Sequence, residues 1–220
     1  MTHTLHRTGN IESLKEDFPM LTHVARGFND IGAGERLKQM AEIARKYTEL
    51  NFGDCKVANQ FMMPPEEIME KHTVGWQVVF KDKRSLIACM KELKEKNIGI
   101  SVVVSGLFDE VLECCKKAEI NPPLIEFALG IHGNKDKIWP PEILDFVTMC
   151  GHGLVSGHLV KKMVEDIKKK KITIKRAAVE LAKPCLCGAF NPHRAAELLK
   201  KMVAQAADYG VRLNPSSRDH

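Results

Sequence analysis

The chain has 220 residues, of which 44% are hydrophobic and 28% charged, so it is long enough to bury a core without disulfide staples. The net charge of +5 comes largely from Lys168-Lys169-Lys170-Lys171 and Lys200-Lys201; without aromatic neighbours these runs favour solvated helix ends and argue against a nucleic-acid partner. No apolar stretch reaches the length of a membrane span and the N-terminus lacks a signal-peptide core, which predicts a cytoplasmic protein with no membrane attachment.

Strands and helices alternate along the first part of the chain. Residues 1–17 are polar and predict a lead-in, loose or with a short helix, and residues 18–138 predict an α/β sheet domain. The sheet is expected to be mixed or parallel, with about five strands and crossover helices. The expected strands are 18–25, 55–61, 76–80, 99–105 and 124–130.

The strand at 99–105 is the clearest of the five. Its near-continuous β-branched character indicates burial on both faces, as in the middle of a parallel or mixed sheet. The first two strand-helix-strand units also suit a ferredoxin-like arrangement with an extra helix-strand unit. The sequence leaves the strand order open.

After Trp139-Pro140-Pro141 the pattern becomes entirely helical, which predicts a helical, cysteine-containing subdomain over residues 139–209 and a flexible tail over 210–220. Thr173 and Asn191 stand where helix N-caps belong, and Pro192 follows at the first helical position. The expected helices are 143–149, 154–170, 174–182 and 192–207.

Three of the seven cysteines stand in turns that two helices could bring together. Cys150 lies in a glycine-rich turn, and Cys185 and Cys187 form a C-x-C pair before Gly188. Thiols in a cytoplasmic chain stay reduced, so they are better candidates for metal ligands or reactive groups than for disulfides. The alternative is that they are small buried hydrophobes.

A metal centre on Cys150, Cys185 and Cys187 is the preferred hypothesis, most of all an oxygen-sensitive [4Fe–4S] cluster. His152 and His158 are the candidates for a fourth ligand. Three thiolates with one histidine suit tetrahedral zinc equally well, so a structural zinc site in a binding protein stays open. If one iron is left without a protein ligand, it could act as a Lewis acid, as in an iron–sulfur-dependent lyase. If His152 or His158 fills the fourth place, electron transfer or a structural role is expected instead.

Met149-Cys150-Gly151-His152-Gly153 resembles the Met-Cys-Gly-His-Gly signature of the proline racemase and hydroxyproline epimerase family. In that family the cysteine lies at a helix N-terminus and moves a proton at an amino-acid α-carbon. The resemblance covers these five residues only, and family members are longer, with two similar halves. It implies a metal-free acid/base role for Cys150, with His152 beside it. A position at the start of a helix opening at Leu154 would lower the pKa of Cys150.

Arg194 follows the C-x-C pair at the start of the last expected helix. Its guanidinium and the free N–H groups there could bind a carboxylate or phosphate beside the thiols. The expected partner is therefore a small-molecule substrate or a redox partner, and a homo-oligomer is left open. The sequence does not identify the reaction.

Overall fold

The computed structural model describes residues 6–71 and 74–208 of the chain. Its sheet has four strands in the order β2-β3-β1-β4: β1 (Phe18–His23), β2 (Phe52–Gly53), β3 (Gln77–Phe80) and β4 (Ser101–Val104). Every neighbouring pair is antiparallel. The class is therefore α/β as predicted, but the expected sheet of five parallel or mixed strands is not what forms.

Interleaved connections explain the antiparallel pairing. Helix α2 (Ala33–Tyr47) joins β1 to β2, and α4 (Lys83–Lys96) joins β3 to β4. In each unit the two joined strands run parallel, but a strand of the other unit lies between them. The strand order and connections are those of the ferredoxin-like alternative, with α3 (Pro65–Glu70) inserted between β2 and β3.

Three strand predictions differ from the structure. Residues 55–61 form turns, apart from one isolated bridge between Asn59 and Gly53, and the short β2 precedes them; residues 124–130 have no regular structure. β4 lies at a sheet edge and is exposed or only partly buried along its length, whereas its β-branched sequence indicated a central strand. The reason is topological, because β-branched residues favour any strand and the interleaved order puts β1 and β3 in the centre.

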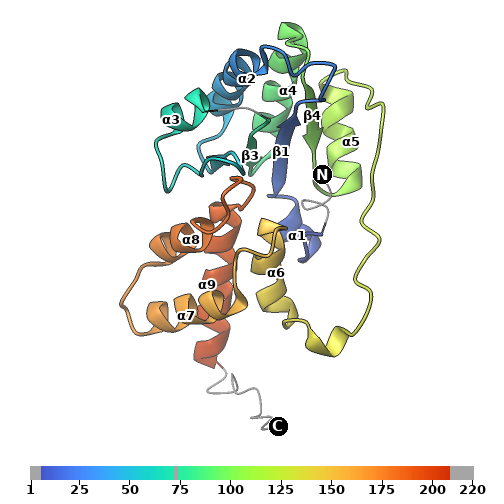
Figure 1. Cartoon of the computed structure of the whole chain (residues 1–220). Coiled ribbons are helices and arrows are strands. Elements are labelled where there is room, and N and C mark those ends of the chain that lie inside the picture. The colour runs from blue at the N-terminus through green and yellow to red at the C-terminus, as the bar shows by residue number, and fades with distance from the viewer. Residues whose placement is uncertain (1–5, 72–73, 209–220) are drawn as a thin grey trace.

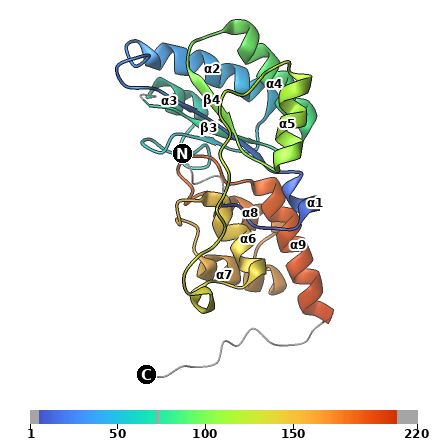
Figure 2. The same cartoon turned by 90° about the vertical axis from the view of Figure 1, so that its right-hand side faces the viewer.

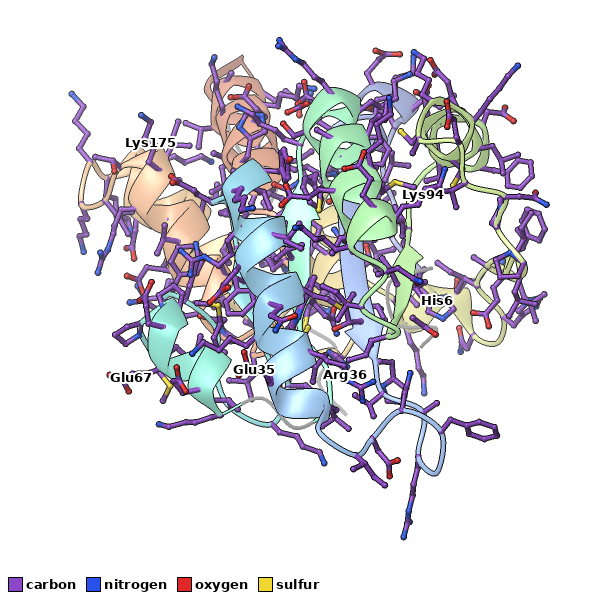
Figure 3. The ribbon with its side chains drawn as sticks, turned by 90° about the horizontal axis from the view of Figure 1, so that it is seen from above. His6, Glu35, Arg36, Glu67, Lys94 and Lys175 are labelled. Carbon is purple, nitrogen blue, oxygen red and sulfur yellow. The ribbon has the colours of Figure 1, made fainter. Side chains whose placement is uncertain are left out.

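Helices α2 and α4 cover one face of the sheet. They lie side by side when the molecule is seen from above, with Glu35 and Lys94 exposed on their outer surfaces (Figure 3). Apolar residues of both helices join a core with the sheet strands and with α5 (Phe108–Lys117). Asp82 begins α4 by accepting a hydrogen bond from the N–H of Ser85 (2.8 Å).

A second apolar core lies below the sheet and is built by four helices (Figures 1 and 2). They are α6 (Pro141–Cys150), α7 (Gly157–Lys168), α8 (Ile174–Ala182) and α9 (Pro192–Asp208). Thr173 caps α8 and Asn191 accepts from the N–H of Arg194 in the first turn of α9, as predicted. None of the described helices is long and apolar enough to cross a membrane.

The polar lead-in is tied to the helical core. Residues 11–14 form the short helix α1 (Ile11–Leu14), which Asn10 caps. The hydroxyl of Thr8 donates to Asp145 and its N–H donates to the hydroxyl of Thr148, both on α6, and the two threonine hydroxyls also share a hydrogen bond. The predicted tail at 210–220, like residues 1–5, lies outside the described part of the chain.

Candidate metal centre

Three thiols and one imidazole come together where the helical core meets the sheet. Cys150 is the last residue of α6, His152 follows it, and Cys185 and Cys187 lie in the loop between α8 and α9. The sulfur atoms of Cys185 and Cys187 are 3.7 Å apart, and Nδ1 of His152 is 3.6 Å from the sulfur of Cys187. Cys150 shares a hydrogen bond with Cys185. The four groups therefore form a continuous chain of neighbours.

Hydrogen bonding and burial keep two of these thiols, Cys150 and Cys185, protonated. All three are 1% exposed or less. The hydrogen bond to Cys185, followed by burial, raises the pKa of Cys150. The hydrogen bond with Cys150 lowers the pKa of Cys185, but the hydrogen bond with Cys187 and burial outweigh it and raise the pKa to about 12. At neutral pH both are neutral thiols, which are poor nucleophiles and poor bases.

The position of Cys150 differs from the prediction. It ends α6, and the next helix begins only at Gly157, so the negative end of a helix dipole lies beside the sulfur and the expected lowering of its pKa is wrong. Two backbone groups lower the pKa of Cys150, because the N–H groups of His152 and Leu154 bond to its sulfur. The N–H of Phe190 does the same for Cys185. Such donors stabilise sulfur that carries negative charge, as metal-bound thiolate does.

Two buried asparagines fix the loop that carries Cys185 and Cys187. Nδ2 of Asn59 donates to the carbonyls of Ala182, Lys183 and Cys185 at 2.8–3.2 Å. Nδ2 of Asn51 donates to the carbonyl of Phe190 (2.8 Å). Both asparagines come from the sheet domain, so that domain holds the loop in place. Sequence reasoning missed them because no periodicity or motif marks a residue whose partners lie more than 100 positions away.

The same loop lies directly against β2. A Cβ built on Gly53 would overlap the backbone of Leu186 and Cys187, and one built on Gly188 would overlap the backbone of Phe52 and Gly53. Gly188 also has φ +81°, the left-handed region. Two facing glycines thus allow the backbone contact that sets the distance between the C-x-C pair and β2.

Gly188→Ala is expected to destabilise the protein by more than about 3 kcal/mol in denaturant unfolding, because backbone overlap adds to about 1–2 kcal/mol of left-handed strain. Gly133→Ala is the matched control: Gly133 has φ +91° but open space around it, so it carries the strain alone. Equal losses of stability in the two variants would show that the contact with β2 is unimportant.

Arg194 does not take the place expected of it. It is 1% exposed, and its Nη1 pairs with Asp17 (2.8 Å) while its Nε donates to Ser13 (2.9 Å). The guanidinium is thus occupied by the N-terminal segment. We therefore do not include Arg194 in the site, and the anion-binding role predicted for it has no support from this geometry.

Arg7 links this ion-pair network to both thiol-bearing turns. It pairs with Asp17 (2.6 Å) and donates through Nη2 to the carbonyls of Met149 (2.9 Å) and Ala189. Met149 precedes Cys150 and Ala189 follows the C-x-C loop. One guanidinium therefore holds the two turns at a fixed separation, a role that no motif or periodicity in the sequence indicates.

The other predicted ligand lies elsewhere. His158 is exposed on α7 and meets Trp139 edge-on, with 4.9 Å between ring centres. His152 is therefore the histidine that the structure places beside the thiols. Cys89, Cys114 and Cys115 belong to the first core, and Cys55 is exposed in the turn after β2.

A cavity of about 230 Å³ opens beside His152. Its walls come from β1, the turn after β2 and the approach to β3, and include His23, Cys55, Lys56 and Trp76. A cavity of this size admits a small molecule of few heavy atoms. His152 is thus in contact with both the thiol cluster and this cavity.

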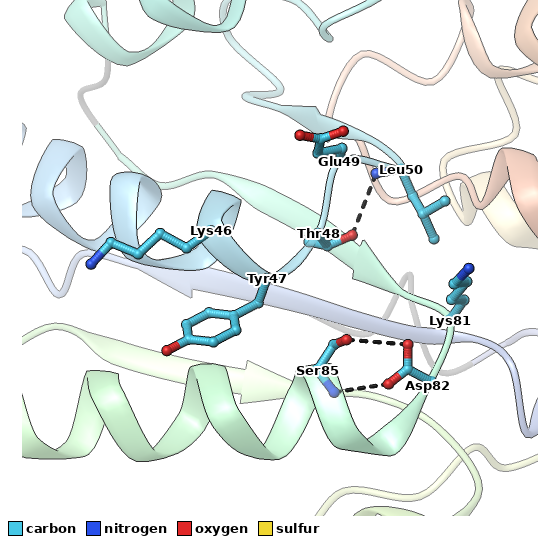
Figure 4. A pocket seen from close by; sticks show the side chains of 8 residues that line it. All are labelled: Lys46, Tyr47, Thr48, Glu49, Leu50, Lys81, Asp82 and Ser85. Atoms are coloured by element: carbon cyan, nitrogen blue, oxygen red, sulfur yellow. Dashed lines mark hydrogen bonds between the residues drawn. The ribbon is translucent and has the colours of Figure 1, made fainter.

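A larger cavity of about 500 Å³ lies away from the thiols, between the end of α2 and the start of α4 (Figure 4). Several of its polar groups already have structural partners. Asp82 caps α4 through Ser85, and Lys46 and Tyr47 both bond to Glu92. This cavity offers no convergent set of reactive groups.

The thiol cluster does not close around a single point. Among residues 6–71 and 74–208, no group of three or more His, Cys, Asp or Glu side chains stands ready to hold a metal ion. One edge of the cluster nevertheless has the right length for zinc. Zinc–sulfur bonds of about 2.3 Å place two sulfurs of a tetrahedral site about 3.8 Å apart, and the sulfurs of Cys185 and Cys187 are 3.7 Å apart.

Comparisons with protein-family models, with curated proteins and with solved structures find no match for this chain.

Proposed function

We propose that this protein is a metal-centre protein in which the thiolates of Cys150, Cys185 and Cys187 bind a thiophilic metal and His152 supplies the fourth donor. The observation that carries the proposal is the convergence of three buried thiols, from turns 35 residues apart, beside an imidazole. With their pKa values raised, Cys150 and Cys185 do little chemistry as uncharged thiols at neutral pH. A metal would displace their protons, and the N–H groups bonded to Cys150 and Cys185 would stabilise the resulting charge.

Two centres match the donor set, and different observations favour each. The 3.7 Å edge between the sulfurs of Cys185 and Cys187 favours one tetrahedral zinc ion. The soft donor set of three thiolates favours a [4Fe–4S] cluster, in which each thiolate binds a different iron. Soft sulfur donors argue against calcium and magnesium in either case.

The cavity beside His152 supports a role in small-molecule chemistry over a purely structural one. A molecule bound there would reach the centre from the His152 side, where Lewis-acid or redox chemistry could act on it. The metal-free acid/base alternative is weaker, because the pKa of Cys150 is raised. Reduced thiols and an oxygen-sensitive centre are consistent with a cytoplasmic protein.

The test is to purify the full chain without oxygen and to measure iron, zinc and acid-labile sulfide per chain. Iron with matching sulfide and a brown colour is expected for the cluster; one zinc per chain, stable in air, is expected for the mononuclear site. Protein that contains neither metal, and does not bind either when supplied under reducing conditions, would overturn the proposal.

A further inference from the structure

An unusually apolar segment connects the two cores. Residues 121–134 run along the outside of the molecule without helix or strand (Figures 1 and 2). Five large apolar side chains of this segment are exposed, among them Leu124 (73%), Phe127 (63%) and Leu129 (84%). The other two are Ile125 and Ile131. An exposed run of this kind is rare on a monomer surface and marks an interaction site.

The sheet offers a matching open edge. β4 is the last strand in the order and, within the described part of the chain, pairs with β1 alone. Ser101 and Val102 are exposed, and across the described residues no backbone partner bonds to the outer side of β4. Such an edge presents unpaired N–H and C=O groups at alternate residues and is a template for another strand.

The segment and the edge lie close to each other without pairing. Phe127 packs on Phe108 at the start of α5, with 5.1 Å between ring centres, which brings the segment near the end of β4. The other end of β4 is reached by the loop of Phe28 and Ile31, both 92% exposed, because Asn29 of that loop bonds to Gly99 (2.9 Å). Apolar surface therefore flanks the edge at both ends.

We propose that the chain forms a two-fold dimer in which residues 124–130 of one copy pair as a strand with β4 of the other. In residues 124–130, large apolar side chains recur at every second position, as in a strand, and Glu126 is the only charged residue. The surface that they contact is therefore expected to be apolar. The same chain carries both halves of the contact, so two copies related by a two-fold axis can exchange them reciprocally, and such an arrangement closes after two copies.

The area is sufficient for a stable dimer. The five exposed side chains present on the order of 500 Å² per copy, so reciprocal pairing buries on the order of 1,000 Å² before any contribution from β4, which is the size that specific interfaces need. The two strands added to the sheets supply main-chain hydrogen bonds as well.

Sedimentation of the full chain tests the dimer, with Leu129→Asp as the disrupting variant. The wild type is expected to sediment as a dimer at micromolar concentration, and Leu129→Asp as a monomer, with at least tenfold weaker association. Met62→Asp is the control, since Met62 is also 60% exposed but lies elsewhere, and it should stay dimeric.

Hydrogen exchange separates pairing between copies from pairing within one chain. Amides of 124–130 and 101–104 are expected to be protected at high protein concentration and to lose that protection on dilution. Protection that is independent of concentration, in a monomer, would mean that the segment completes its own sheet and would overturn the dimer. Fast exchange at every concentration would overturn it too.

Discussion

The Cys185→Ser/Cys187→Ser variant is expected to bind metal more than about 100-fold more weakly than the wild type, since losing groups that merely support metal ligands already costs 10–100-fold. The two sulfurs lie at the middle of the chain of contacts, with Cys150 on one side and His152 on the other. Removing both leaves one thiol and one imidazole that no longer share a neighbour. The measurement is metal per chain after anaerobic purification, together with the loss of any cluster absorbance.

A matched double variant controls for general damage. Cys114→Ser/Cys115→Ser also exchanges two buried thiols for hydroxyls, but in the first core, and it should keep its metal. Circular dichroism confirms that each variant is folded. If both variants lose metal equally while folded, or if Cys185→Ser/Cys187→Ser keeps its metal, the assignment of ligands is wrong.

Local patterns in the sequence predicted most of the helices and the meeting of the cysteines. The two helices between Cys150 and Cys185 have clear apolar faces, a cap at Thr173 and short turns, so folding back is the simplest way to bury those faces. The convergence of Cys150 with Cys185 and Cys187 follows from this arrangement. What the cluster holds stays a proposal.

The strand order and the contacts between residues distant in sequence could not be predicted from such local patterns. The strand order depends on which strand inserts between the two members of a strand-helix-strand unit, and side-chain type does not encode that choice. Asn59 and Arg7 act on carbonyls that are distant in sequence, and backbone carbonyls carry no sequence signal at all. The sequence pattern correctly predicts that Arg194 lies in the first turn of the last helix, but it does not indicate its partner Asp17, which lies 177 positions away.

Asp17→Asn is expected to lower the free energy of unfolding by roughly 3–5 kcal/mol, the cost of breaking a buried ion pair from one side. The Asp17 side chain is fully buried and pairs with Arg7 (2.6 Å) and Arg194 (2.8 Å). Asparagine keeps the shape but not the charge, so two guanidinium groups would stay buried without their carboxylate. Since proteins are stable by about 5–15 kcal/mol, thermal unfolding should shift down by roughly 10 °C.

The control is Asp166→Asn, which removes the carboxylate of an i,i+4 pair with Lys162, whose side chain is 63% exposed. An exposed pair of this kind contributes less than about 1 kcal/mol, so the unfolding temperature should barely move.

Asp17→Asn has a further consequence through Arg7, which holds the carbonyls of Met149 and Ala189. With that clamp loosened, metal affinity should fall even where the variant is folded. If Asp17→Asn unfolds at the wild-type temperature, the ion-pair network contributes nothing to stability. If the variant loses stability but keeps its metal affinity, the network stabilises the fold without positioning the metal ligands.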